Sequence, residues 1–207
     1  MNTALKKLYP HASIALTFGN DWELLVAVEL SAQCTDVLVN KVTPRLFKKY
    51  RTLDDYVGAT QEEFEQDIKQ CGFYRNKAKN ILAAAKLVKE KFGGRVPKTM
   101  SEILTIPGVA RKTGNVVLGN AHGVVEGMAV DTHVRRFAIR FDLSDYRDPV
   151  RIERDLMALL PKKEWFPFTY RLINYGRAVC PARPHECKKH PLTKIYPAAA
   201  SRWPKAH

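Results

Sequence analysis

The stretch that decides the fold is Leu104-Thr105-Ile106-Pro107-Gly108-Val109-Ala110-Arg111-Lys112-Thr113-Gly114-Asn115-Val116-Val117. A short helix meets Pro107-Gly108, the chain turns within a few residues, and a second helix begins. Such a turn points several backbone N–H groups in one direction at a helix N-terminus, where they can bind a phosphate. Arg111 and Lys112 add positive charge in the first turn of the second helix. The stretch therefore predicts a helical hairpin that is able to hold an anion.

Helical spacing of apolar residues continues over nearly the whole chain. The run Asp21–Leu30 carries only three charges, which indicates a helix buried on most sides. Residues 78–88 carry an apolar stripe at i, i+3, i+4 and i+7 that ends at Gly93-Gly94. Further helices are predicted over residues 36–50, 60–72, 99–104, 110–121, from 131 onward, 149–160 and 163–179. Alternating strand patterns are rare, so the chain is predicted to be all-α, with about ten helices and short connections.

The composition is that of a soluble, basic globular protein. Lys and Arg number 34 against 21 Asp and Glu, which leaves a formal net charge of +13 over 207 residues. This excess points to a polyanionic partner, although charge alone does not separate nucleic acid from other anionic surfaces. No apolar run approaches the ~18 residues that cross a bilayer, and the N-terminus lacks an apolar signal core. Four cysteines are too few for a disulfide scaffold, so a reducing compartment is expected.

Three further motifs accompany the hairpin. They are Leu30-Ser31-Ala32-Gln33-Cys34-Thr35-Asp36, Gly72-Phe73-Tyr74-Arg75-Asn76-Lys77-Ala78 and Val130-Asp131-Thr132-His133-Val134. Together with the hairpin they resemble, in order and spacing, the motifs of the endonuclease III family of helix-hairpin-helix DNA glycosylases, over roughly residues 20–180. The family hairpin usually carries glycine where this chain has Ala110, and we expect the hairpin to survive that change.

The resemblance implies a base-excision-repair enzyme that removes oxidised or damaged pyrimidines from duplex DNA and then cleaves the abasic strand by β-elimination. Lys112 matches the family nucleophile, an amine that forms a Schiff base with the sugar. A lysine in such a place is, without the family context, more often a solvated surface residue. Asp131 matches the family carboxylate that stabilises positive charge at the sugar, and its position also predicts a helix N-cap.

Base excision requires the damaged base to leave the stack, and the family fills the gap with one side chain from each of two loops. Gln33 and Phe73 match these positions, Gln33 as a partner for the orphaned base and Phe73 as a wedge. A core position is the alternative for Phe73. The residues expected to bind DNA are Gln33, Phe73, Gly108, Ala110, Arg111 and His133, with charge added beside the wedge by Arg75 and Lys77.

Two of these assignments have structural alternatives. Asp36 matches a family acid near the base pocket, and it is equally placed to cap the helix that begins there. His133 is a candidate phosphate contact, but a lone histidine more often makes a structural hydrogen bond.

The cysteines depart from the family pattern. Many family members end in Cys-x6-Cys-x2-Cys-x5-Cys, which holds a [4Fe–4S] cluster. Here Cys180 and Cys187 keep the first spacing, but the next two positions are His190 and Tyr196. We therefore expect these positions to be vestigial, with neither a cluster nor another cofactor. Zinc is an alternative for Cys180, Cys187 and His190, although three ligands leave an open site and no fourth is evident.

By resemblance, residues 14–124 form a six-helix domain with the hairpin, and residues 1–13 join 125–207 in a second helical domain across a DNA-binding cleft. From about residue 180 the chain is expected to be a basic, irregular tail, since residues 177–207 hold seven Lys and Arg against one acid. The expected partner is double-stranded DNA with damaged bases or abasic sites, bound by a monomer in the cytoplasm (at the nucleoid in a prokaryote) and not at a membrane. Two other functions stay open: a non-catalytic helix-hairpin-helix DNA-binding module, and a mismatch-adenine glycosylase, against which Lys112 argues.

Overall fold

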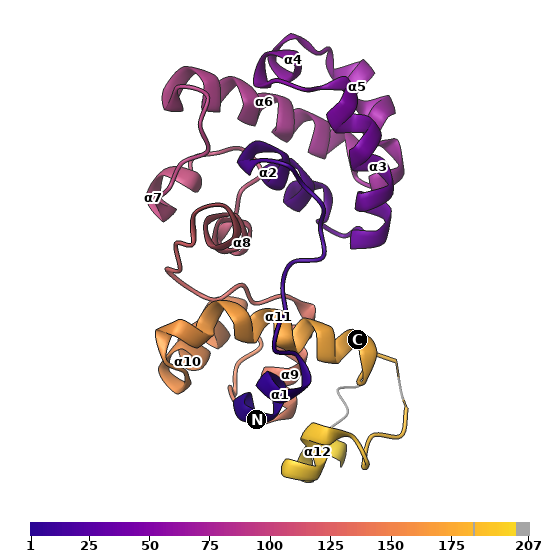
Figure 1. Ribbon diagram of the computed structural model, residues 1–207, viewed down its shortest axis with the longest axis vertical. Coiled ribbons are helices and arrows are strands. Elements are labelled where there is room, and N and C mark those ends of the chain that lie inside the picture. Colours follow the sequence, from indigo (N-terminus) through magenta and orange to yellow (C-terminus); the bar gives the residue numbers. More distant parts are fainter. Residues whose placement is uncertain (184, 202–207) are drawn as a thin grey trace. The chain divides into compact units, whose positions relative to one another are not determined.

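The computed structural model describes residues 1–183 and 185–201, and every regular element among them is helical. In chain order the helices are α1 (Asn2–Leu8), α2 (Asp21–Leu30), α3 (Asp36–Lys49), α4 (Leu53–Gly58), α5 (Gln61–Ile68), η1 (Lys69–Cys71), α6 (Tyr74–Phe92), α7 (Met100–Ile103), α8 (Arg111–His122), α9 (Thr132–Arg140), α10 (Pro149–Leu159), α11 (Lys162–Ala178), α12 (Pro191–Ile195) and α13 (Ala198–Ser201). Figure 1 shows their course along the chain. The all-α prediction is confirmed for the described residues.

Side-chain caps start several of these helices. Thr60 accepts a hydrogen bond from the N–H of Glu63 at 3.2 Å, as its position predicts. Helix α4 has no counterpart among the predicted helices. Its start is a reciprocal capping box between Thr52 and Asp55, and this Thr-x-x-acid spacing is the signal by which the sequence reveals it.

The chain divides into two compact units, which we call the central unit (Ala15–Val124) and the terminal unit (Met1–Ile14 with the chain from Val125 onward). In the central unit, α2 lies against α3, α6 and α8, while α4 and α5 pack on α6. The last seven residues of α2, Leu24–Leu30, are all buried, which confirms the prediction of a helix enclosed on most sides. One member of this buried run is a glutamate, Glu29.

In the terminal unit, α1 packs on α11. The carboxylate of Glu164 on α11 accepts charge-assisted contacts from Lys6 at 2.6 Å and from Arg171 at 2.8 Å. These contacts, with Lys6 as the largest cause, lower the pKa of Glu164 to about 2. Helix α1 is therefore fixed to the second half of the chain by an ion pair as well as by the buried side chain of Leu5.

In the described part of the tail, residues 180–183 and 185–190 form no helix, but α12 and α13 follow them, so the prediction of an irregular tail is wrong for residues 191–195 and 198–201. Leu192 of α12 and Ala199 of α13 are buried in the apolar core of the terminal unit. Burial of these small apolar residues stabilises two short helices in a stretch that is basic overall. Residues 184 and 202–207, which the tail prediction also covered, lie outside the described residues.

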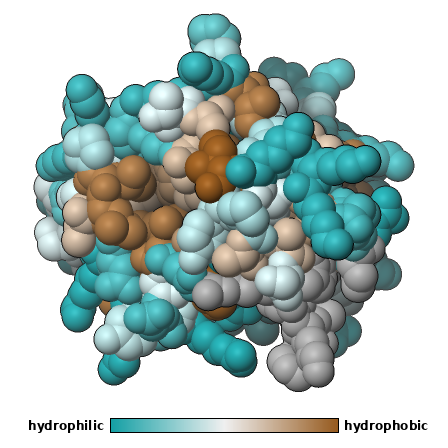
Figure 2. Space-filling view, turned by 90° about the horizontal axis from the view of Figure 1, so that it is seen from below, coloured by the Kyte–Doolittle hydropathy of each residue, from teal (hydrophilic) through white to brown (hydrophobic). Residues whose placement is uncertain are grey.

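One face of the molecule is mainly hydrophilic. Figure 2 shows hydrophilic residues over most of one face, with hydrophobic residues gathered in patches between them. Among the described residues, no helix combines the length and the apolar character that crossing a membrane requires.

Candidate active site and nucleic-acid interface

The hairpin turn between α7 and α8 depends on Gly108. Its φ of +83° lies in the left-handed region. A Cβ on Gly108 would lie only 2.6 Å from Oε2 of Glu29 and 3.1 Å from Cβ of Asn80. The turn closes with a hydrogen bond from the N–H of Val109 to the carbonyl oxygen of Ile106 at 3.1 Å. Position 108 thus requires glycine for two reasons: the left-handed backbone conformation, and the close approach of side chains from α2 and α6 to its Cα.

Ala110 follows the turn as the N-cap residue of α8, with φ −92° and ψ 170°. L residues adopt this conformation freely, so the hairpin forms with alanine where the family usually has glycine. The Ala110 side chain caps nothing, and the first N–H groups of an α-helix have no acceptor within the helix. The positive end of the α8 dipole therefore offers a place for an anion.

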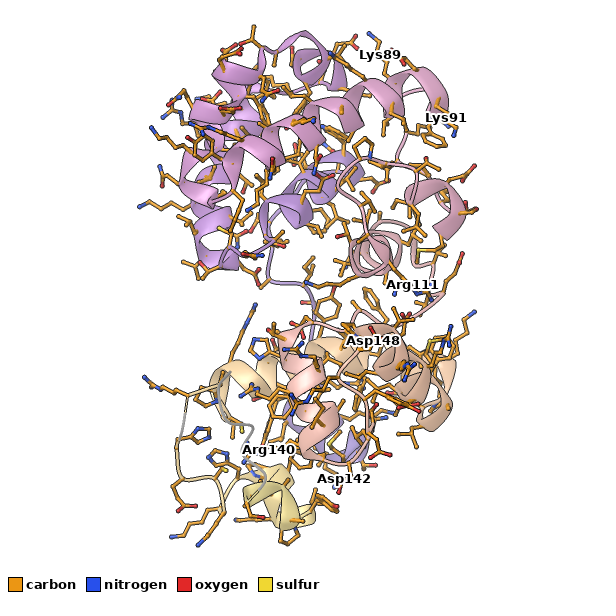
Figure 3. The ribbon with its side chains drawn as sticks, turned by 180° about the vertical axis from the view of Figure 1, so that it is seen from behind. Lys89, Lys91, Arg111, Arg140, Asp142 and Asp148 are labelled. Atoms are coloured by element: carbon orange, nitrogen blue, oxygen red, sulfur yellow. The ribbon has the colours of Figure 1, made fainter. Side chains whose placement is uncertain are left out.

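Arg111 and Lys112 are the first two residues of α8. Arg111 is half-buried and lies at the start of the helix (Figure 3), whereas the side chain of Lys112 is exposed. An exposed position leaves the amine accessible to a substrate, and the helix N-terminus adds positive potential around it.

Two loops of the central unit carry non-glycine residues with a left-handed backbone, Gln33 with φ 51° and Phe73 with φ 45°. This conformation costs an L residue roughly 1–2 kcal/mol, so the surrounding packing must hold both residues in it. The Phe73 side chain is 65% exposed, which excludes the core position that was its alternative. Both side chains line the same pocket, so the structure brings the two predicted base-stack residues together.

Lys77 connects these two loops. Its ammonium donates to the carbonyl oxygen of Leu30 at 2.8 Å and to that of Cys71 at 2.6 Å. The first carbonyl ends α2 shortly before Gln33, and the second lies two residues before Phe73. Lys77 is buried, and this burial lowers the pKa of its ammonium. The prediction that Lys77 adds charge for DNA is therefore wrong, because its ammonium is enclosed and holds the loops in place.

The pocket beside these loops has a volume of about 260 Å³. It is lined by Glu29, Ala32, Gln33, Phe73, Asn76, Lys77, Asn80, Gly108 and Thr113. Glu29 is 6% exposed, and burial raises the pKa of its carboxyl to about 8. None of the motifs pointed to this acid. The signal that reveals it is a single charge within the otherwise apolar run Leu24–Leu30.

Asp36, the acid predicted for the pocket, is not part of this wall. It is the first residue of α3 and half-buried. It does not cap that helix either, because Thr35 is the N-cap residue and its hydroxyl accepts from the N–H of Leu38 at 3.3 Å. The acid of this pocket is Glu29.

Asp131 and His133 belong to the terminal unit. Asp131 is half-buried at the start of α9, where Oδ1 accepts from the N–H of Val134 at 2.8 Å, and its predicted N-cap role is confirmed. His133 lies 3.4 Å from the guanidinium of Arg136, and its Nδ1 takes up the space above Gly176 of α11. His133 therefore packs between α9 and α11 as a structural residue. Its contact with a phosphate stays a prediction.

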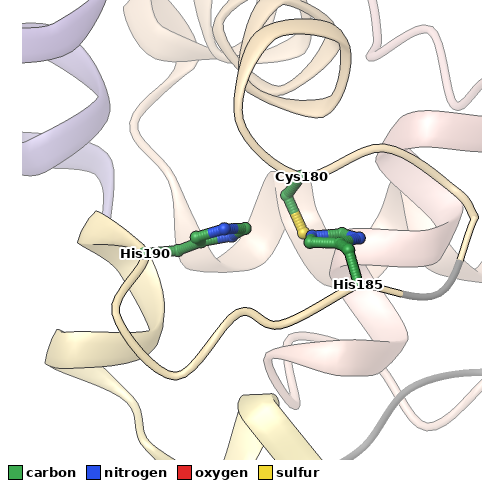
Figure 4. Close-up of side chains that lie close together, drawn as sticks. All are labelled: Cys180, His185 and His190. Carbon is green, nitrogen blue, oxygen red and sulfur yellow. The ribbon is translucent and has the colours of Figure 1, made fainter.

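A second cluster of reactive side chains lies near the C-terminus. The ligating atoms of Cys180, His185 and His190 lie within 4.8 Å of one another (Figure 4). The two imidazole rings stack with their centroids 5.0 Å apart. Cys187 is also buried, and the Arg140 guanidinium, labelled in Figure 3, donates to the sulfur atoms of both Cys180 and Cys187. Burial lowers the pKa of His190, which keeps its imidazole in the neutral form that binds metals.

A family model and curated relatives both match this chain to base excision DNA repair proteins. The model of the HhH-GPD superfamily of base excision DNA repair proteins matches residues 26–162. The endonuclease III of Synechocystis sp. is 50% identical over 195 residues, 94% of this chain and 89% of that protein. That of Bacillus subtilis is 47% identical over 189 residues, 91% of this chain and 86% of that protein.

Solved structures agree with these sequences. A non-covalent endonuclease III–DNA complex has a TM-score of 0.91 at 44% identity, covering 97% of this chain and 94% of that chain. A trapped endonuclease III–DNA covalent intermediate has a TM-score of 0.88 at 45% identity, covering 94% and 91%.

The expectation that this protein has no cofactor site is wrong. Endonuclease III relatives carry a [4Fe–4S] cluster, and here Cys180 and Cys187 are both buried next to histidine nitrogens. The expectation took only thiolates as cluster ligands and considered His190 only for zinc, whereas imidazole replaces thiolate on one iron of Rieske [2Fe–2S] clusters. His185 is the ligand-type residue that it missed, in the spacing Cys180-x4-His185-x-Cys187-x2-His190. These residues fit a metal cluster, which would hold the C-terminal segment in place. Tyr196, at the last cysteine position of the family pattern, instead donates a hydrogen bond from its hydroxyl to the carboxylate of Asp142.

Proposed function

Since this chain belongs to the endonuclease III family of the HhH-GPD superfamily, we propose that Lys112 and Asp131 carry out its chemistry. The activity is that of a bifunctional base-excision-repair enzyme, a DNA glycosylase for oxidised pyrimidines with abasic-site lyase activity. The observation that carries the assignment of the site is the single pocket lined by Gln33, Phe73 and Gly108, where three of the sequence motifs meet.

Lys112 acts as the nucleophile. Its side chain is exposed in the first turn of α8, next to Arg111, so its amine is accessible to a substrate. An unprotonated amine there attacks C1′ of the deoxyribose and displaces the base. The resulting Schiff base draws electrons from the sugar, so that β-elimination breaks the strand on the 3′ side.

Asp131 stabilises the positive charge that develops on the sugar as the base departs. Its carboxylate already accepts one backbone N–H at the start of α9, and this contact orients the carboxylate. Lys112 belongs to the central unit and Asp131 to the terminal unit.

Binding of duplex DNA uses the hairpin and the two loops. Backbone N–H groups at the start of α8 hold a phosphate, and this contact carries no base specificity. Phe73 enters the base stack with its exposed ring, while Gln33 takes the place opposite the orphaned base. Solved endonuclease III structures are DNA complexes, which supports duplex DNA as the partner. We further propose that the protein acts on damaged bases and abasic sites as a monomer in the cytoplasm.

Borohydride reduction in the presence of abasic duplex DNA tests the lyase chemistry. The native protein is expected to form a stable covalent adduct, Lys112→Ala to form none, and Lys98→Ala, which removes an exposed lysine of the same unit, to behave like the native protein. Native protein that binds abasic DNA but neither nicks nor cross-links it would establish the non-catalytic DNA-binding module instead. Release of adenine from mismatches without an adduct would identify the mismatch-adenine glycosylase.

A further inference from the structure

Glu29 is an acid that the proposed roles leave unused. It lies in the last turn of α2 with 6% of its surface exposed. Its Oε1 atom is buried and has no hydrogen-bond partner among the described residues. Its Oε2 atom lies against the backbone of Gly108, so closely that no larger residue fits there. The carboxyl group thus stands at the foot of the hairpin turn, on the wall of the pocket.

Among the residues that the structure describes, no cation is seen to neutralise this carboxyl. Lys77 is the ionisable residue that shares the described pocket wall with Glu29, and its ammonium donates to two backbone carbonyls. Helix α8 contributes Thr113 to the wall, and α3 contributes none of the described lining residues. An unpaired carboxylate in a buried place is costly, so the group takes up a proton instead. In keeping with this, burial raises the pKa of Glu29 to about 8.

A protonated carboxyl group differs from a carboxylate in what it offers a ligand. It carries one O–H donor beside an acceptor oxygen, whereas a carboxylate only accepts. The remaining α2 residues from Leu24 to Leu30 are apolar, and an apolar side chain at position 29 would avoid the desolvation cost. An acid at such a position is a candidate for a functional role.

The pocket has the character of a site for a small planar polar molecule. Its volume of about 260 Å³ is slightly below the ~300–1,000 Å³ of pockets that enclose drug-sized ligands. The amide side chains of Asn76 and Asn80 add donors and acceptors to its wall, and Phe73 adds an aromatic face. Carbonyl oxygens and ring nitrogens of a pyrimidine base match donors and acceptors of this kind.

We propose that Glu29 is a catalytic residue, the acid that donates a proton to the pyrimidine base in this pocket as the base is expelled. The proposal rests on the glycosylase function and on Lys112 as the nucleophile. It assigns the pocket to the leaving base, so the chemical class of its ligand is a nucleobase with carbonyl groups. Lys112 attacks the sugar, whereas Glu29 contacts the leaving group.

The proton balance of the step is simple. The bond between C1′ and the base nitrogen breaks, and its electron pair leaves with the base. The amine nitrogen of Lys112 supplies the electron pair of the new C1′–N bond. The base takes the proton of Glu29, which leaves a carboxylate, and the Lys112 nitrogen loses a proton to water. Water then returns a proton to Glu29, so no other reactant is required.

Two variants separate proton donation from packing. Glu29→Gln keeps the shape and a hydrogen-bond donor but cannot give up a proton, and Glu29→Leu restores an apolar α2. Single-turnover excision is measured on a duplex with one thymine glycol, and nicking is measured on a duplex with a ready-made abasic site. General acid catalysis contributes ~10²–10⁴-fold, so both variants are expected to lose at least about 100-fold in base excision. Nicking of the abasic duplex, which has no base to protonate, stays within about twofold of the native rate.

A matched variant, a folding check and a pH profile serve as controls. Glu90→Gln changes an exposed acid of the same unit and is expected to keep both rates, and thermal melting confirms that each variant folds. Native excision should also fall as the pH rises past the pKa of Glu29, about 8, because the acid is then ionised, and Glu29→Gln should lack this decline. Native-like excision by Glu29→Gln, or an equal loss of both activities in the two variants, would overturn the role of Glu29. Native protein that fails to nick the abasic duplex instead refutes the lyase function on which the proposal rests.

Discussion

Replacing Gly108 with alanine separates the two reasons for glycine in the hairpin. The left-handed backbone, with φ +83°, costs an L residue roughly 1–2 kcal/mol. The added Cβ would lie 2.6 Å from Oε2 of Glu29, and such overpacking costs typically ~1–3 kcal/mol. The free energy of unfolding should therefore fall by about 3 kcal/mol. In a protein of this size that lowers the Tm by about 6–12 °C.

Gly123→Ala is the matched control. Gly123 follows the other end of the same helix, α8, with φ +65°, and a Cβ there would meet nothing within 4 Å. It should therefore lose only the backbone contribution, roughly 1–2 kcal/mol, or about 2–8 °C in Tm. The Tm values are measured by circular dichroism, and the difference between the variants gives the cost of the close approach.

A third variant identifies the atom responsible. In a Glu29→Ala background the nearest obstacle to the new Cβ is gone, so Gly108→Ala should cost less than in the native chain, by about 1 kcal/mol or more. If Gly108→Ala and Gly123→Ala lower the Tm equally, the approach of α2 to the hairpin turn does not constrain position 108, and the reasoning is refuted.

Three further predictions concern groups elsewhere in the chain. Lys77→Met leaves two buried carbonyl oxygens without their donor, so the free energy of unfolding in urea should fall by roughly 1–3 kcal/mol and base excision should be slower. Lys79→Met, which changes an exposed lysine of the same helix, should alter neither the stability nor the excision rate. The pKa of Glu164 is lowered from 4.5 to about 2, so its contribution to stability is present above pH 4.5 and is lost as the pH falls toward 2. Glu164→Gln should therefore flatten this part of the curve of Tm against pH. An unchanged curve in Glu164→Gln would contradict the ion pair. Cys180→Ser should lower the iron or zinc per chain in elemental analysis and any visible absorbance, while Cys34→Ser should not; native protein purified without metal contradicts the site.

The helices and the hairpin were predictable because their signals are local. Caps such as Thr60 and a Pro-Gly turn act on residues a few positions away, so they can be read without knowing the fold. Asp131 followed the same logic as a helix cap.

The errors concern contacts between residues distant in sequence. The sequence alone indicates that Lys77 is a surface charge. In the fold its ammonium donates to the carbonyl oxygen of Leu30 at the end of α2, 47 positions away. Glu29 reads as one more helix residue until the hairpin closes over it. His185 reads as a tail residue until the chain folds back beside Cys180 and His190.

The terminal unit is built from both ends of the chain, and this has a consequence for synthesis on the ribosome. Helix α1 is made first, yet its partner α11 is made more than 150 residues later. At ~5–20 residues per second, α1 waits on the order of ten to thirty seconds with its apolar face uncovered. The central unit can fold during this interval from a continuous stretch of chain. A nascent chain of this protein therefore passes through a stage with one finished unit and a loose N-terminal helix, which is the stage at which a chaperone would bind it.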